Sequence, residues 1–193
     1  MQLVWPAPRY LAGYVDALKR GWEVDHLRGR ASTRDQLQAI AAGAGAFLDQ
    51  EVDREGKGPP IALPDGSMTR RLPGFTRWLW DGEFCGRINL RWQPGTAELP
   101  PHVLGHIGYA VVPWKQRRGY ATQALRDLLP LAWAEGLPHV EITADRDNVA
   151  SRRVIETNGG RVVEEFDKPV QYGGAASVRY RIVRERPELH QDP

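Results

Sequence analysis

The chain has 193 residues, of which 41% are hydrophobic and 26% are charged, with a formal net charge of +2. This composition is typical of a globular protein with one sizeable core, and so weak a positive charge argues against a nucleic-acid-binding arm. The first residues lack a signal-peptide pattern and no apolar run is long enough to span a membrane, so we expect a cytoplasmic protein. The single cysteine, Cys85, excludes an internal disulfide and is expected to be a buried strand residue.

The N-terminal third is predicted to be helical. Apolar residues recur at helical spacing over residues 8–20, and Gly21 follows in a position suited to a C-terminal cap. A second helix is expected to begin near Ser32 or Thr33 and to run to about residue 48. Residues 56–74 are rich in glycine, proline and arginine, which predicts a long, mobile loop of the kind often found in binding sites.

A β-sheet is expected in the middle of the chain. Residues 76–80 and 84–92 form the two arms of a predicted hairpin around Asp81-Gly82, a strong turn signal. A third strand is expected from residue 102 or 103 to Val112, so that three antiparallel strands precede a helix. That helix should end before Leu137-Pro138. The following strand, residues 139–145, is predicted to lie parallel to the third strand.

The C-terminal part continues this alternation. Asp147 or Asn148 can cap a helix that runs to about residue 158, and Gly159-Gly160 closes it. Strands are expected at residues 161–166 and 177–183, and residues 188–193 are predicted to be a frayed tail.

A basic, glycine-containing loop joins the third strand to its helix, with the sequence QRRGYA at residues 116–121. Backbone N–H groups at a helix start have no intrahelical acceptor, and the helix dipole is positive there, so this segment predicts an anion site. The loop matches neither the phosphate-binding loop of nucleotide hydrolases nor the glycine fingerprint of dinucleotide folds.

Three segments together resemble the GNAT superfamily of N-acetyltransferases, in the branch of predicted acetyltransferases: GHIGYAVVP (105–113), QRRGYA (116–121) and DNVASRRVIETNGG (147–160). The resemblance covers residues 75–166 and includes the order of the elements. It implies an α/β fold of the GNAT type, with a mixed, mostly antiparallel sheet flanked by helices. It also implies a single acetyltransferase domain over residues 1–193, in which residues 1–75 shape the acceptor site and residues 76–186 form the cofactor-binding core.

The resemblance implies acetyl-CoA as cosubstrate and no metal. Gly119 would allow the pyrophosphate to approach the backbone, while Lys115 and both arginines of the loop would add positive potential. The backbone at Val111 and Val112 would pair with the pantetheine arm as an added strand. Asn148 caps the helix and is also expected to bond the pantetheine. The residues expected to bind the cofactor are Val111, Val112, Gln116, Arg117, Arg118, Gly119, Tyr120, Ala121, Asn148 and Ser151.

Direct acetyl transfer needs a base for the amine and a proton for the departing thiolate. The tyrosine that many family members use as the acid corresponds to Ile155 here, so this acid is absent. Ser151 is our candidate donor, with a helix-surface serine as the alternative. His106 is our candidate base because the unperturbed pKa of histidine, about 6.5, suits neutral pH, with a structural histidine as the alternative. Weaker candidates are Glu83, Tyr109 and Glu141.

The resemblance therefore predicts an N-acetyltransferase that moves an acetyl group to a primary amine by direct attack in a ternary complex. The alternative is a non-catalytic acyl-CoA-binding or protein-interaction module, which the missing tyrosine favours. The expected acceptor is a small-molecule or peptide amine that Trp78 and Trp80 could border. We expect no membrane or nucleic-acid partner, and a monomer or homodimer.

Overall fold

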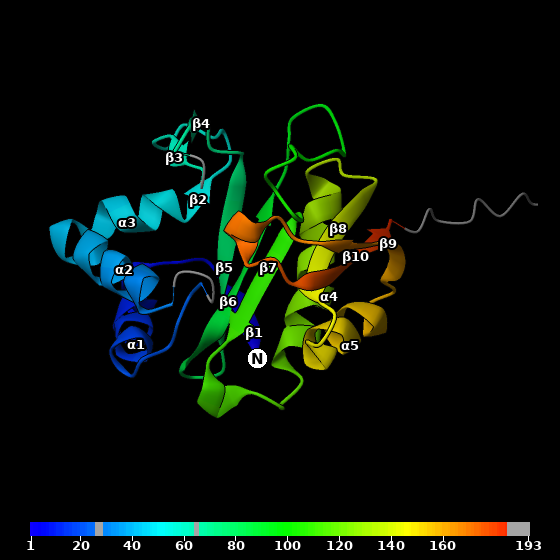
Figure 1. The fold of residues 1–193 in the computed structure, drawn as a ribbon. Coiled ribbons are helices and arrows are strands. Elements are labelled where there is room, and N and C mark those ends of the chain that lie inside the picture. The colour runs from blue at the N-terminus through cyan, green and yellow to red at the C-terminus, as the bar shows by residue number, and fades with distance from the viewer. Residues whose placement is uncertain (26–28, 64–65, 185–193) are drawn as a thin grey trace, which may run out of the picture.

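Two β-sheets lie at the centre of the molecule in the computed structural model, which describes residues 1–25, 29–63 and 66–184. The strands of the first sheet are, in spatial order, β1 (Gln2–Val4), β5 (Gly74–Trp80), β6 (Phe84–Arg91) and β7 (Ile107–Val111), with β2 (Val52–Asp53) also paired to β5. The strands of the second sheet are β8 (His139–Asp145), β10 (Ala176–Val183) and β9 (Arg161–Asp167). All these pairs are antiparallel, and the strands of the two sheets run in different directions (Figure 1).

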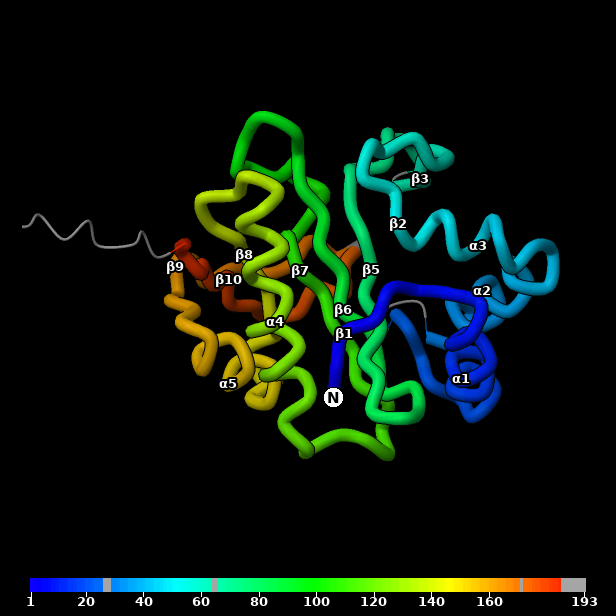
Figure 2. Tube along the Cα trace, turned by 180° about the vertical axis from the view of Figure 1, so that it is seen from behind, coloured from blue at the N-terminus to red at the C-terminus, as the bar shows by residue number. Residues whose placement is uncertain are grey.

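Helices flank the sheets on two sides. One group covers the first sheet on one side: α1 (Pro8–Lys19), α2 (Arg30–Ala42) and α3 (Ala44–Gln50). On the opposite side, α4 (Tyr120–Ala134) packs against β1, β6 and β7 of the first sheet, and α5 (Val149–Thr157) packs against α4 and β8 (Figures 1 and 2). Tyr14 of α1 stacks on Trp78 of β5, with ring centroids 4.7 Å apart, whereas Leu125 and Leu128 of α4 are buried in a second core with Ile142 of β8. The predicted α/β fold is confirmed.

The elements that depend on short-range signals agree with the sequence. The helix predicted at residues 8–20 is α1, and Gly21 follows it with φ +87°. The predicted hairpin is β5–β6, with Gly82 at φ +107° in its turn. Asn148 caps α5, since its Oδ1 accepts a hydrogen bond from the Ser151 N–H at 3.0 Å.

The single helix predicted after residue 32 is wrong. Gly43 has an extended backbone and separates α2 from α3, so the helix is broken where the sequence contains its weakest helix former. The helix also begins earlier than predicted, with Gly29 as its N-cap. The hydroxyls of Ser32 and Thr33 are buried instead, and they donate to the carbonyl oxygens of Gly29 and Trp22.

The segment predicted as a loop, residues 56–74, contains a short hairpin of β3 (Ile61–Ala62) and β4 (Met68–Thr69). The three-residue strand β1 was not predicted at all. It pairs with β5, more than seventy positions away, and a strand this short has no periodicity of its own.

The third strand is shorter than predicted and begins only at Ile107. The residues before it turn towards β8: Thr143 Oγ1 donates to the Leu104 carbonyl, and the His106 N–H donates to the Glu141 carbonyl at 2.7 Å. In the described part of the chain no ladder joins β7 to β8, so their parallel orientation stays a prediction. Short 3₁₀ helices follow at Pro113–Lys115 and Val170–Tyr172.

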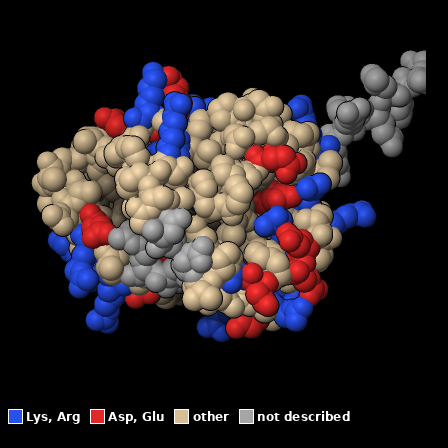
Figure 3. Space-filling model, turned by 45° about the horizontal axis from the view of Figure 1, so that its top comes forward, with Lys and Arg blue, Asp and Glu red and all other residues tan. Residues whose placement is uncertain are grey.

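Charged residues are spread over the surface, and on the face in Figure 3 basic and acidic side chains surround a largely uncharged middle. Among residues 1–25, 29–63 and 66–184, no helix is long and apolar enough to cross a membrane. The predicted tail, residues 188–193, lies outside the described residues. The division into an acceptor part, residues 1–75, and a cofactor part, residues 76–186, stays a prediction.

Candidate active site

The site lies where the two sheets separate. Within the described residues β7 pairs only with β6, and β8 pairs only with β10, so each strand keeps one unpaired edge. These edges meet near His106 and Glu141 and diverge beyond them (Figure 1). An unpaired strand edge inside a fold offers N–H and C=O groups with which an extended ligand can pair.

Only alternate residues of β7 offer such groups, because backbone groups in an antiparallel strand point alternately to its two edges. The N–H of Val112 donates to the Cys85 carbonyl of β6 at 2.9 Å, and its carbonyl accepts from the Lys115 N–H. The predicted pantetheine contact at Val112 is therefore wrong, since both of its groups are used within the protein. Tyr109 and Val111 face the unpaired edge, where the Val111 carbonyl accepts from the Gln116 side chain at 3.3 Å.

The loop after β7 has the backbone shape of an anion site. Arg117 and Gly119 both adopt positive φ, at +59° and +75°. Gly119 is the N-cap of α4, and none of the described side chains caps this helix. Across the described structure, no backbone carbonyl accepts from the N–H groups of residues 117–122. Arg117 and Arg118 are exposed beside them. These features fit the pyrophosphate of coenzyme A.

Lys115 does not face this loop. Its side chain is buried, and its Nζ donates to both carboxylate oxygens of Asp81 at 3.0 Å and lies 2.9 Å from Glu83. The hydroxyl of Tyr120 also donates to Asp81, at 2.7 Å. Burial alone would raise the pKa of Asp81, but the bonds from Tyr120 and Lys115 more than offset it, so this pKa lies well below its usual value.

This cluster changes three predictions. Lys115 serves as a brace between the helix start and the β5–β6 turn, so the predicted positive potential from it towards the phosphates is wrong. Glu83 is paired with this lysine at the turn, which gives the proposed catalytic role no support. Tyr120 keeps only its backbone N–H for a ligand, because its hydroxyl is bonded to Asp81.

Three predicted residues come together across the space between the sheets. The hydroxyl of Tyr109 lies 2.8 Å from Ser151 Oγ and also donates to the Ser151 carbonyl at 3.2 Å. Ser151 is in turn held by its backbone bond to Asn148. Burial raises the pKa of Tyr109 to about 12, so its hydroxyl stays protonated at neutral pH. The chain of bonds from α5 to β7 thus places two hydroxyls beside the free edge of β7.

His106 is fully buried where the sheets meet. Its Nδ1 accepts a hydrogen bond from the Glu141 N–H at 2.9 Å, which occupies the lone pair that a general base would use. Burial lowers the pKa of His106 to about 4, with Glu141 opposing the shift. This geometry favours the structural alternative.

The residue at the position of the missing tyrosine, Ile155, belongs to the hydrophobic core. Ile155 is fully buried with residues of both sheets and α4. Cys85 is likewise buried, which raises the pKa of its thiol to about 12, as expected for a structural cysteine. Trp78 is fully buried in the core, so it does not border an acceptor pocket. Trp80 packs on Tyr10, with their ring centroids 4.7 Å apart.

Sequence reasoning missed a polar row on β6, formed by Arg87, Asn89 and Arg91. The alternation of polar and apolar residues in RINLR was the available signal, because it places these three side chains on one face of a central strand.

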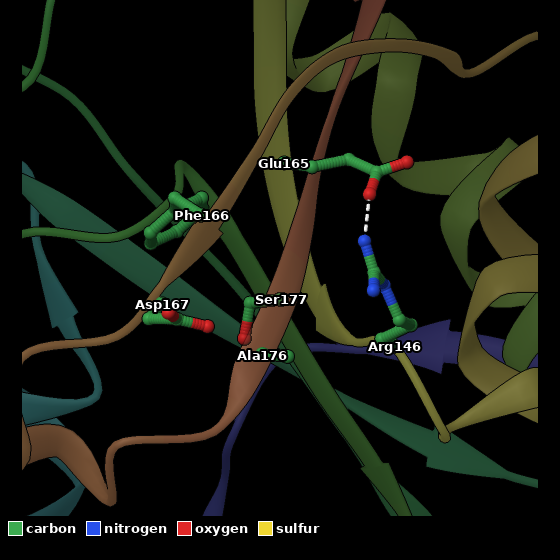
Figure 4. Close-up of a pocket in the computed structure, with 6 residues that line it drawn as sticks. All are labelled: Arg146, Glu165, Phe166, Asp167, Ala176 and Ser177. Atoms are coloured by element: carbon green, nitrogen blue, oxygen red, sulfur yellow. Dashed lines mark hydrogen bonds and ion pairs between the residues drawn. The ribbon is translucent and has the colours of Figure 1, made fainter.

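A shallow hollow of about 290 Å³ lies elsewhere, at the ends of β8, β9 and β10. The residues that line it are Arg146, Glu165, Phe166, Asp167, Ala176 and Ser177 (Figure 4). Arg146 and Glu165 form an ion pair at its side. None of the predicted site residues lines this hollow. In the described residues, no three His, Cys, Asp or Glu side chains are grouped as a metal site would require.

The family model of the acetyltransferase (GNAT) domain matches residues 29–161, more than half of the chain. The chain belongs to the GNAT acetyltransferase family. No curated protein sequence matches it significantly.

Solved structures share the fold. RimJ of Mycobacterium smegmatis, in complex with CoA-disulfide, has a TM-score of 0.60 and 20% identity over 98% of this chain and 83% of its own. The microcin C7 self-immunity acetyltransferase MccE, in complex with acetyl-CoA and AMP, has a TM-score of 0.58 and 14% identity over 94% and 91% of the two chains. A probable acetyltransferase with 26% identity aligns over 57% of this chain and 62% of its own, with a TM-score of 0.47.

Proposed function

We propose that this GNAT protein transfers an acetyl group from acetyl-CoA to a primary amine by direct attack in a ternary complex. The observation that carries the proposal is the edge of β7, which no described strand pairs, together with the start of α4, which no described side chain caps. An extended pantetheine arm can pair with the first, and a pyrophosphate can bind the second. The complexes of RimJ with CoA-disulfide and of MccE with acetyl-CoA support the same use of this fold.

Each cofactor-binding residue has a role in this proposal. Tyr109 and Val111 offer backbone groups along the strand edge, and Gln116 stays close through its bond to the Val111 carbonyl at 3.3 Å. The loop residues Arg117, Arg118, Gly119, Tyr120 and Ala121 offer N–H groups, and the two arginines add charge. Asn148 fixes the start of α5 and with it Ser151.

Ser151 is the proposed proton donor to the departing thiolate. The serine proton can point at the sulfur in the state in which the Tyr109 hydroxyl donates to Ser151 Oγ rather than to the Ser151 carbonyl. Tyr109 then acts through Ser151 and is a positioning residue in this scheme. A strand N–H on the free edge of β7 would stabilise the negative charge that develops on the thioester oxygen. His106 has no free lone pair for the amine proton, so we propose a structural role for it.

Two measurements test the function. Calorimetry with acetyl-CoA measures binding, and release of free thiol in the presence of amino acids, polyamines, aminoglycosides and peptides measures transfer. Thiol release with an acetylated product supports the enzyme. Binding without thiol release across the panel would favour the non-catalytic module, for which the absence of the usual acid at Ile155 is the supporting observation. No binding would refute both.

The roles of the hydroxyls are tested by a double-mutant cycle. Ser151→Ala is expected to lower kcat by about tenfold or more, with acetyl-CoA affinity little changed. Tyr109→Phe should lower kcat less. If Tyr109 acts through Ser151, the double variant is no slower than Ser151→Ala alone. Multiplicative losses would show that the two side chains act independently.

A further inference from the structure

The polar row on β6 lies on the face of the first sheet that α1–α3 cover. Arg87, Asn89 and Arg91 alternate with buried Ile88 and Leu90, whose side chains belong to the core between the sheets. In the strand register Asn89 lies between two small or polar neighbours. These neighbours are Thr76 of β5 and Gly108 of β7.

Arg87 has its partners within the protein. Its Nη2 donates to Thr76 Oγ1 at 3.0 Å and lies 3.4 Å from a carboxylate oxygen of Glu51, which directly follows α3. Glu51 is itself 9% exposed, so this pair is largely shielded from water. The charge of Arg87 is therefore balanced.

Arg91 has no such balance. Its Nε is shielded from solvent without a hydrogen-bond partner, and across the described residues no carboxylate pairs with its guanidinium. Burial lowers the pKa of Arg91, and the neighbouring Arg87 lowers it further. A partly buried cation without a counter-ion is costly, so such a group points to an anion that arrives with a ligand.

Asn89 and Arg91 converge over one glycine. A Cβ placed on Gly108 would lie 3.0 Å from Asn89 Oδ1 and 3.5 Å from Arg91 Nη2. Among the described residues, no hydrogen bond partners the Asn89 side chain. Gly108 therefore lets these polar ends lie close over the strand, where even a Cβ would be crowded. The neighbouring residue, Tyr109, has its side chain on the opposite face of the sheet.

We propose that Arg91 and Asn89 bind an oxyanion of the acceptor, so that the substrate is an amine that also has a carboxylate or a phosphate group. The proposal rests on the proposed acetyl transfer. A guanidinium presents a planar fork of donors that matches both anions, and the amide of Asn89 can add one more donor. The acceptor would reach β7 from the α1–α3 side, opposite to the hydroxyls of Tyr109 and Ser151. Bound there, the anion would hold the amine beside the point where the sheets meet.

Matched acceptors test the charge. Amino acids are compared with their amides, which lack the carboxylate, and phosphoethanolamine is compared with ethanolamine. For the wild-type protein we expect kcat/KM to be at least about tenfold higher for the anionic member of one of these pairs, and that pair identifies the anion as carboxylate or phosphate. Equal kcat/KM within both pairs would overturn the proposal.

Matched variants test the residue. Arg91→Gln should lower kcat/KM for the anionic acceptor by at least about tenfold more than for its neutral partner, and so remove most of the preference. Arg161→Gln, on exposed β9, is the control and should keep the preference. Arg91→Lys retains the positive charge without the planar fork of the guanidinium, so it should keep only part of the preference for the anionic acceptor. An equal loss for anionic and neutral acceptors in Arg91→Gln would assign Arg91 a structural role and refute the proposal.

A binding measurement that does not depend on acetyl transfer tests the anion site separately from the proposed acetyltransferase activity. Of the N-acetylated forms of the anionic acceptors in the two pairs, at least one should raise the melting temperature of the wild-type protein and not that of Arg91→Gln. If acetyl-CoA binds and neutral amines are acetylated without an anion preference, the anion site is refuted and the acetyltransferase stands. If acetyl-CoA does not bind, the proposed function fails, and an Arg91-dependent melting shift would still support the anion site.

Discussion

The buried imidazole of His106 predicts that the protein loses stability in mildly acidic solution. Burial lowers the pKa of His106 from 6.5 to about 4. Because the pKa in the folded state lies below that in the unfolded state, the unfolded chain takes up the proton first as the pH falls. The stabilisation is therefore complete above a pH of about 6.5 and is lost as the pH falls towards about 4. At about 1.36 kcal/mol per pKa unit, the loss amounts to about 3 kcal/mol in total and about 2 kcal/mol by a pH of about 4.5.

Urea unfolding of the wild-type protein and of His106→Asn at a pH of about 7 and of about 4.5 measures this loss. The asparagine oxygen can accept the bond from the Glu141 N–H, and it does not titrate. The wild type should lose about 2 kcal/mol more than the variant between the two conditions. His139 lies 6.4 Å away between ring centroids and its pKa is also lowered, chiefly by burial, so His139→Asn is measured beside it as the control. Asp81, whose pKa is lowered in the folded protein, also loses stabilisation as the pH falls, but it is present in both proteins and cancels in the difference between them.

An equal pH dependence in the wild type and His106→Asn would refute this reasoning, because it would mean that the imidazole titrates normally in the folded protein. The same variant tests the base role that the sequence suggested. If His106 were the base, the acidic limb of the pH–rate profile would disappear in His106→Asn. A structural histidine leaves this limb in place.

Three further predictions concern the cofactor loop and its surroundings. Gly119→Ala, at φ +75°, should cost about 1 kcal/mol of stability and weaken acetyl-CoA binding in calorimetry. The control Gly136→Ala, at φ +87° after α4, should cost as much stability without weakening this binding. An equal loss of acetyl-CoA affinity in both variants would contradict the anion site. Lys115→Met removes the main cation at Asp81 and should lower the free energy of unfolding by about 1–3 kcal/mol, and an unchanged urea midpoint would show that this brace is unimportant. Ile155→Tyr forces a ring into a fully buried position and should destabilise by about 1–3 kcal/mol without faster thiol release, so a stable and faster variant would show that this position faces the cofactor.

Elements whose residues interact locally were predictable from the sequence. The Asp81-Gly82 turn and the Asn148 cap each depend on contacts within three residues, so the pattern contains the whole cause. The sequence-based predictions fail where contacts between residues distant in the sequence decide the local structure. The third strand starts late because residues 104–106 bond to β8, and β1 exists only because β5 offers it an edge.

The site follows the same division. The loop around Gly119 and the cap at Asn148 were found because contiguous motifs and the backbone define them. The pairing of Tyr109 with Ser151 was not predicted, although both residues were candidates, because they lie 42 positions apart and meet only when α5 packs against β7. The role of Arg91 was missed entirely, since nothing in a sequence tells which arginine lacks a counter-ion.

By itself, then, the sequence determined the family and the helix start that suits a pyrophosphate, because both depend on contiguous residues and on backbone geometry that those residues dictate. The tertiary structure alone decided which strand edges stay unpaired among the described residues, and that Val112 and Lys115 are bonded within the protein. It also decided that the lone pair of His106 Nδ1 is occupied, and that Arg91 lies over Gly108 without a carboxylate partner in the described part of the chain. Each of these depends on which distant residues become neighbours, and packing sets that for the whole chain at once.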